Sequence, residues 1–157
     1  MNSHSAAAPL APQRFRAAWN AAAAVLERLV SHDLLALAAR IAIGAIFLQS
    51  GRTKVEGVLS VSESAVALFA DEYRLPLLSP LFAAHAATYA EHLFPLLLFA
   101  GLFTRFAALA LLGMVAVIQV FVYPDAWPTH LSWAALLAYL AARGGGRFSV
   151  DRLCGLR

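Results

Sequence analysis

The sequence predicts an all-α membrane protein: a four-helix transmembrane bundle with an N-terminal amphipathic helix and a short interfacial helix between spans one and two. Of the 157 residues, 61% are hydrophobic and only 13% are charged, about half the charged fraction of a soluble domain. Apolar segments that approach the thickness of a bilayer recur along the chain. Eleven of the 12 basic residues lie outside those segments, a pattern that suits membrane orientation and not nucleic-acid binding.

Residues 13–30 predict a helix that lies on the membrane surface. Its apolar residues recur on one face at i, i+4, i+7, i+11 and i+14: Phe15, Trp19, Ala22, Leu26 and Leu29. A signal peptide is the alternative, because two arginines precede an alanine-rich run. Asn20 and Glu27 interrupt that run too early for a signal sequence. We therefore assign residues 1–33 to a tail and surface helix, and residues 34–157 to the membrane domain.

The first span is predicted over residues 34–50 and contains one charged side chain. Five residues share a helix face at i, i+4, i+7, i+11 and i+14: Arg40, Gly44, Phe47, Gly51 and Lys54. The two glycines on this face would let a neighbouring helix approach closely. Arg40 could extend to the near membrane surface or pair with Glu91 across the bundle. We expect the pair with Glu91, because a stranded buried charge is costly.

Residues 56–79 are too polar to cross a membrane. A short amphipathic helix is predicted over residues 62–73, resting on the membrane surface. Ser60 and Ser62 are candidate N-caps for this helix. Prolines then interrupt the chain before the second span.

The second span is predicted over residues 81–103, which would extend about 34 Å as a helix. Its first half carries five polar residues: His85, Thr88, Tyr89, Glu91 and His92. His85, Tyr89 and His92 form one stripe at i, i+4 and i+7, and Pro95 is expected to kink the helix. Three interpretations stay open: contacts that hold neighbouring helices together, a proton, quinone or ligand site, or a metal site.

The third span is predicted over residues 106–123, with Gln119 as its polar interior group. The fourth apolar segment, residues 131–142, reaches a full span only if residues 127–129 form its first turn, where Pro128 is tolerated. Trp127 resembles an interface aromatic residue. Three glycines at 144–146 stop this segment, and a short basic tail follows.

The distribution of basic residues predicts the orientation. With four spans, both termini lie on one side, together with eight basic residues, against three on the other side. The positive-inside rule then places the N- and C-termini in the cytoplasm.

Several of these motifs together resemble the DoxX family. They are the spaced Arg40 to Lys54 face, Glu91-His92-x2-Pro95, Gly101 to Arg105, Trp127-x2-His130-Leu131-x-Trp133 and Gly146-x2-Ser149-x-Asp151. The resemblance covers residues 35–153. It implies a small four-helix protein of the bacterial inner membrane. Some relatives are membrane subunits of a thiosulfate:quinone oxidoreductase, and others are linked to oxidative-stress or thiol-redox complexes. The family's recurring polar positions fall here on Arg40, Lys54, Glu91, Arg105 and His130.

A quinone site needs an apolar slot and groups that exchange protons. We predict the catalytic residues to be Glu91, His92 and His130, although His130 could instead be a capping or interface histidine. We predict that quinone or another substrate is bound by Arg40, Lys54, His85, Tyr89, Arg105 and Trp127. No metal site is assigned, since His85 and His92 are about 10.5 Å apart along one helix. A haem ligated by histidines is a weaker alternative.

Three classes of function remain at this point. The first is a membrane subunit of a redox complex that touches quinone or sulfur chemistry and works with a soluble partner. The second is a scaffold whose polar residues only hold the bundle together. The third is a small transporter or metal-handling protein. All three share the lipid bilayer as a partner, and a homo-oligomer is left open.

Overall fold

The computed structural model describes residues 11–156, and the chain divides into two compact units, residues 1–32 and 33–157. The first unit contains helix α1 (Ala11–Leu29), which confirms a helix over the predicted amphipathic segment. Phe15, Trp19 and Leu26, on its predicted apolar face, are each at least 60% exposed. That its apolar face rests on a membrane stays a prediction.

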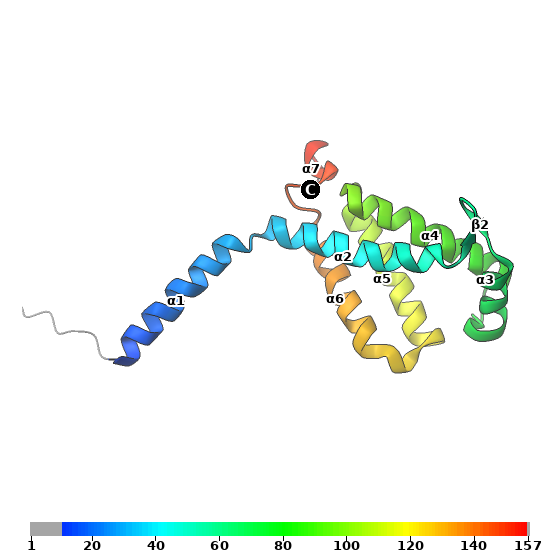
Figure 1. Cartoon of the computed structure of the whole chain (residues 1–157), viewed down its shortest axis with the longest axis horizontal. Helices are drawn as coiled ribbons and strands as arrows, with labels where there is room; N and C mark the ends of the chain where they lie inside the picture. The colour runs from blue at the N-terminus through cyan, green and yellow to red at the C-terminus, as the bar shows by residue number, and fades with distance from the viewer. Residues whose placement is uncertain (1–10, 157) are drawn as a thin grey trace, which may run out of the picture. The chain divides into compact units, whose positions relative to one another are not determined.

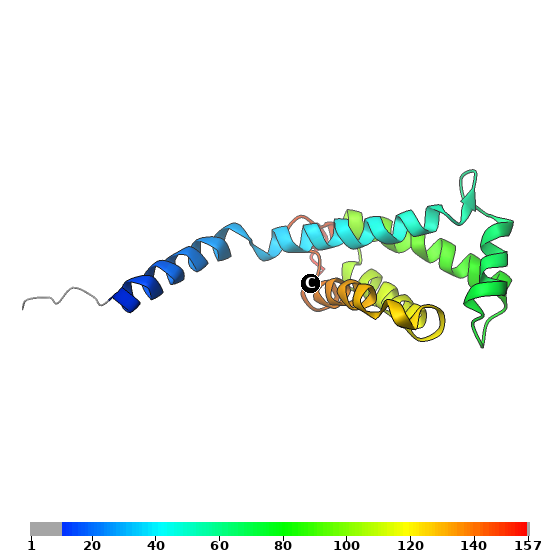
Figure 2. The same cartoon turned by 60° about the horizontal axis from the view of Figure 1, so that its bottom comes forward.

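The second unit is built on four long helices (Figures 1 and 2). They are α2 (His32–Arg52), α4 (Pro80–Ala100), α5 (Thr104–Val117) and α6 (Trp127–Arg143). Two helical stretches in the described chain are long and apolar enough to cross a membrane: α2, and α5 together with its extension to Val122. The pattern of apolar helices agrees with an all-α membrane protein. As expected, α6 begins at Trp127 and accommodates Pro128 in its first turn.

Small residues let the four helices pack closely. Their shared core contains Ala36, Ala39, Ile43, Phe47, Leu98, Ala107, Ala108, Leu111, Val115, Leu137 and Leu140. A Cβ at Gly44 would lie 2.7 Å from the Phe99 ring, and one at Gly51 would lie 2.9 Å from the His92 ring. Both glycines therefore allow α4 to approach α2 closely, as their spacing predicted.

The connection between α2 and α4, residues 53–79, lies at one end of the bundle, beside the last turn of α2 and the first turn of α4 (Figure 1). It starts with a hairpin of β1 (Val55–Glu56) and β2 (Ser60–Val61) that the sequence did not predict. The expected amphipathic helix follows as α3 (Glu63–Leu68), capped by Ser62, and continues into the π-helical segment η1 (Phe69–Tyr73). Phe69 packs on Ala83 and Ala84 of α4.

The buried face of α4 differs from the predicted polar stripe. It contains Ala84, Thr88, Glu91, Pro95 and Leu98. Ala84, Thr88 and Glu91 each stand directly before a residue of the stripe, so the buried face lies about 100° around the helix from it. Tyr89 is accordingly 47% exposed. This rotation brings Glu91 into the protein, and the helix remains continuous through Pro95.

Arg40 is fully buried, but it does not pair with Glu91. Its guanidinium donates to the backbone oxygens of Leu98 (3.1 Å), Phe99 (3.3 Å) and Phe148 (2.5 Å). The prediction that Arg40 pairs with Glu91 was wrong, because α2 and α4 run antiparallel. In that register Arg40 faces the end of α4, and Glu91 lies about two turns closer to its start.

The segment after α6 is part of the fold and not a loose tail. Helix α6 ends at Arg143 with Gly144 as its C-cap, and a short helix α7 (Val150–Leu153) follows. The Asp151 carboxylate accepts hydrogen bonds from the backbone N–H groups of Phe103 (2.7 Å) and Thr104 (2.9 Å). It therefore caps the N-terminus of α5, where a negative charge also complements the helix dipole.

Candidate functional site

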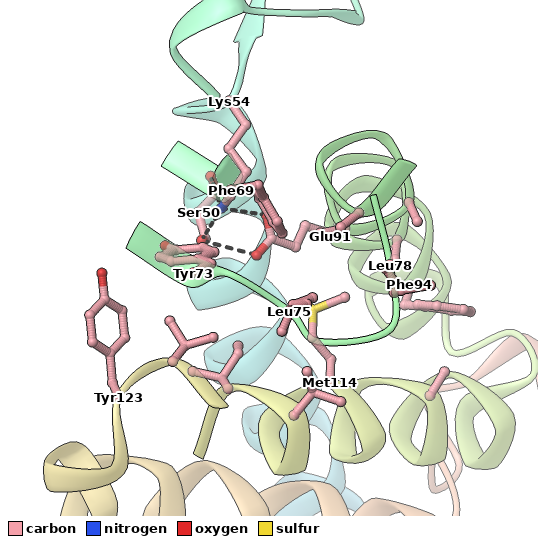
Figure 3. Close-up of a pocket in the computed structure, with 18 of the residues that line it drawn as sticks. Ser50, Lys54, Phe69, Tyr73, Leu75, Leu78, Glu91, Phe94, Met114 and Tyr123 are labelled. Carbon is pink, nitrogen blue, oxygen red and sulfur yellow. Dashed lines mark hydrogen bonds and ion pairs between the residues drawn. The ribbon is translucent and has the colours of Figure 1, made fainter. Parts of the chain in front are cut away.

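A cavity of about 410 Å³ lies between the C-terminal end of α2, η1, α4, α5 and the first turns of α6 (Figure 3). The π-helical segment η2 (Ile118–Val122), which extends α5, also lines it. Its lining is mostly apolar and includes Phe69, Leu75, Ala87, Phe94, Met114 and Val117. This volume falls within the range of about 300–1,000 Å³ typical of small-molecule sites.

One wall of this cavity carries a buried ion pair. The Lys54 ammonium lies 2.7 Å from Glu91 Oε2, and both side chains are at most 7% exposed. Lys54 Nζ also donates to the Ser50 hydroxyl (2.9 Å) and to the Ser50 backbone oxygen (3.2 Å). The Ser50 hydroxyl in turn donates to Glu91 Oε1 at 3.1 Å. Figure 3 shows these three side chains meeting between α2 and α4.

The local sequence explains how this cluster forms. Ser50 and Lys54 are four residues apart at the end of α2, so they share one face of the chain. Gly51 lies between them, and a Cβ there would be 3.0 Å from the Glu91 Cβ atom. The missing side chain lets Glu91 come within hydrogen-bond distance of both partners. Three mutually bonded polar groups offset the high cost of burying each charge alone.

A second polar group enters the cavity from α6. His130 is 5% exposed, and its Nδ1 lies 2.7 Å from Gln119 Oε1 of η2. Gln119 Nε2 donates to the backbone oxygen of Pro124, also at 2.7 Å. The His130 ring packs against Trp133, with ring centroids 5.4 Å apart. The histidine ring is therefore held in place from two sides.

Two tyrosines stand at a further edge of the cavity, one in η1 and one just after η2. The rings of Tyr73 and Tyr123 meet edge to face at 5.7 Å, and the Tyr123 hydroxyl donates to Glu72. Burial raises the pKa of Tyr73. Local π-helical geometry often occurs at functional sites.

Three of the nine predicted site residues line this cavity: Lys54, Glu91 and His130. The other six lie elsewhere. Arg40 donates to backbone oxygens at the end of α4 and to that of Phe148, and Arg105 donates to the backbone oxygens of Ala141 and Ala142 at the end of α6. These two arginines hold helix ends together.

The remaining four predicted residues also lie outside the cavity lining. His85 and His92 each place Nδ1 against the backbone oxygen four residues earlier, at 2.8 and 2.7 Å. Tyr89 packs beside His85, with ring centroids 6.0 Å apart. Trp127 is 59% exposed at the start of α6. The stripe on α4 therefore did not identify the cavity.

Ser50, Tyr73 and Tyr123 were not predicted as site residues, and Gln119 was predicted only as a polar group inside the third span. Ser50 could have been found from its position four residues before Lys54. The tyrosines and Gln119 depend on how η1 and η2 fold back toward each other, which no spacing rule reveals. Within residues 11–156 no group of three or more His, Cys, Asp or Glu side chains is arranged to hold a metal ion.

These features define a small helical protein whose apolar helices point to a membrane location and enclose an apolar cavity with buried polar groups. The chain belongs to the DoxX family, whose model matches residues 35–124. No curated protein and no solved structure matches the chain.

Proposed function

We propose that this DoxX-family protein is the membrane subunit of a redox complex and that it binds a quinone in the cavity. The observation that carries the proposal is the buried Lys54–Glu91 pair on the wall of an otherwise apolar cavity. Ionisable groups at membrane depth are expensive and usually mark functional sites. A lipid tail alone would need no such polar wall.

The lining residues fit the chemistry of a quinone. The apolar walls, with Phe69 and Phe94, suit the ring and its isoprenoid tail. Glu91 and His130 lie at the same cavity and can each take up or release a proton. Lys54 and Ser50 hold the Glu91 carboxylate in place through the bonds described above. We therefore assign proton exchange to Glu91 and His130.

A bound quinone supplies two-electron, two-proton redox chemistry. In this proposal the electrons pass between the quinone and a thiol or sulfur donor on a soluble partner. Cys154, the single cysteine, is exposed and cannot form an intrachain disulfide. The chain's own contribution is to bind the ring, exclude water and exchange protons.

We further propose that the protein crosses the bacterial inner membrane four times with both termini in the cytoplasm. The contacts of Asp151 with Phe103, and the ion pair of Arg147 with Asp33, group three helix ends at one end of the bundle. That end carries more basic residues than the end with Lys54. In this orientation the polar wall of the cavity lies toward the outer face of the membrane.

The proposal can be tested on the full chain purified in mild detergent. Organic extraction should recover quinone, and titration with a short-tailed benzoquinone should quench the fluorescence of Trp133. Glu91→Gln should weaken binding of the reduced ligand, the quinol, about tenfold, because a quinol hydroxyl loses its hydrogen bond to the charged carboxylate. Glu56→Gln, on the exposed hairpin, is the matched control. If neither extraction nor titration detects binding in the unmodified chain, the polar cluster only stabilises the bundle and the redox proposal fails.

A further inference from the structure

The hydrogen bonds around Gln119 determine which nitrogen of His130 carries the proton. The Pro124 backbone oxygen can only accept a hydrogen bond, so the Gln119 atom facing it is the amide nitrogen. The amide oxygen of Gln119 therefore faces His130 Nδ1, 2.7 Å away. An oxygen in that position requires a hydrogen on Nδ1. In the neutral ring, Nε2 is then left without a hydrogen and can only accept.

The cavity wall formed by Lys54, Ser50 and Glu91 also offers hydrogen-bond acceptors and no free donors. Lys54 has three N–H groups, and they are donated to Glu91 and to two oxygens of Ser50. The single hydroxyl hydrogen of Ser50 is donated to Glu91. A carboxylate can accept about four hydrogen bonds, and these contacts use two. Positions that remain open on this wall are therefore acceptors.

The lining also contains two phenols and one indole. The Tyr123 hydroxyl donates its hydrogen to Glu72, and the Tyr73 hydroxyl is a donor at the edge of the cavity. Trp133 brings one indole N–H, on the same helix as His130. Since the N–H groups of Lys54 are all donated within the protein, the open positions on Glu91 and His130 are acceptors. A ligand that matches them must carry hydrogen-bond donors.

We propose that the cavity binds an aromatic diol, the quinol form, in preference to the quinone, and that Gln119 is the positioning residue that creates this preference. The inference rests on the proposed function and adds which redox form the resting site favours. A quinol has two hydroxyl groups that can donate to Glu91 and to His130 Nε2. The corresponding quinone has two carbonyl oxygens, which can only accept and would face acceptors.

The first experiment compares three ligands with the same ring and tail: a short-tailed quinol, its quinone and its dimethyl ether. Binding to the full chain in detergent is measured by isothermal titration calorimetry, which treats all three ligands alike. We expect the quinol to bind about tenfold or more tightly than either other ligand, since each lacks the donated hydroxyls. Equal binding of all three would overturn the inference and leave the proposed function standing. Absence of binding by all three would overturn the proposed function as well.

Variants at Gln119 test the positioning role. Gln119→Leu removes the acceptor for the Nδ1 hydrogen, so the quinol preference should fall several-fold. Nitrogen NMR of 15N-histidine-labelled protein reads the tautomer directly: His130 should carry its hydrogen on Nδ1 in the unmodified chain. Unchanged preference in Gln119→Leu, or a hydrogen on Nε2 in the unmodified chain, would overturn the assignment.

Discussion

Replacing Lys54 by methionine removes the ammonium group but keeps an unbranched side chain. The change deletes three hydrogen bonds and leaves the Glu91 carboxylate in an apolar cavity with Ser50 as its one donor. Removing one partner of a buried ion pair costs about 3–5 kcal/mol. Lys54→Met should lower the free energy of unfolding by about this amount. The double variant Lys54→Met/Glu91→Met should regain most of it, because no unpaired charge then remains.

The chain contains a matched control for this measurement. The ion pair between Arg147 and Asp33 is longer, at 3.5 Å, and the Arg147 side chain is 79% exposed. Arg147→Met should therefore cost about 0–1 kcal/mol. Equilibrium unfolding in mixed detergent micelles, followed by far-UV circular dichroism, gives all four free energies. A cost for Lys54→Met no larger than that for Arg147→Met would refute the argument, since it would mean that solvent reaches the Lys54–Glu91 pair.

Four other substitutions, one of them a control, test helix packing, helix capping and the burial of a charge. Gly51→Ala should destabilise the protein by about 1–3 kcal/mol because the added methyl meets the His92 ring, whereas Gly113→Ala, with open space around it, should be neutral or stabilising in a thermal melt. Asp151→Ala removes the cap of α5 and should cost about 1 kcal/mol in the unfolding assay; an unchanged midpoint would contradict that role. Arg40→Met frees three backbone oxygens and should speed tryptic cleavage after residue 147, while an unchanged digestion rate would show that the contact is dispensable.

Helix positions were predictable because they depend on local patterns. Ser62 was foreseen as the cap of α3, and Pro128 in the first turn of α6. The close approach at Gly44 and Gly51 was also foreseen, since small residues on one face allow it with any neighbour. The hairpin Val55–Val61 escaped notice because its strands are only two residues each, too short for an alternating pattern.

The site was harder to predict than the helices, because it depends on rotation and register. Glu91 and His92 are adjacent in the sequence, yet only Glu91 lines the cavity. The sequence of α4 does not show which of the two faces the cavity, because polar residues stand on both of their faces of the helix. The partner of Glu91 likewise depends on the antiparallel register of α2 and α4. That register places Lys54 beside Glu91 and Arg40 beside the end of α4. Such facts emerge only when two helices are packed together.

The contact between Arg40 and Phe148 also bears on how the protein is made. The two residues are 108 positions apart, so the ribosome completes α4, α5 and α6 before the Phe148 oxygen exists. Since chains begin to fold from the N-terminal side during synthesis, Arg40 must enter the membrane with part of its hydrogen-bonding capacity unmet. Closure of the bundle around that guanidinium is therefore a late assembly event.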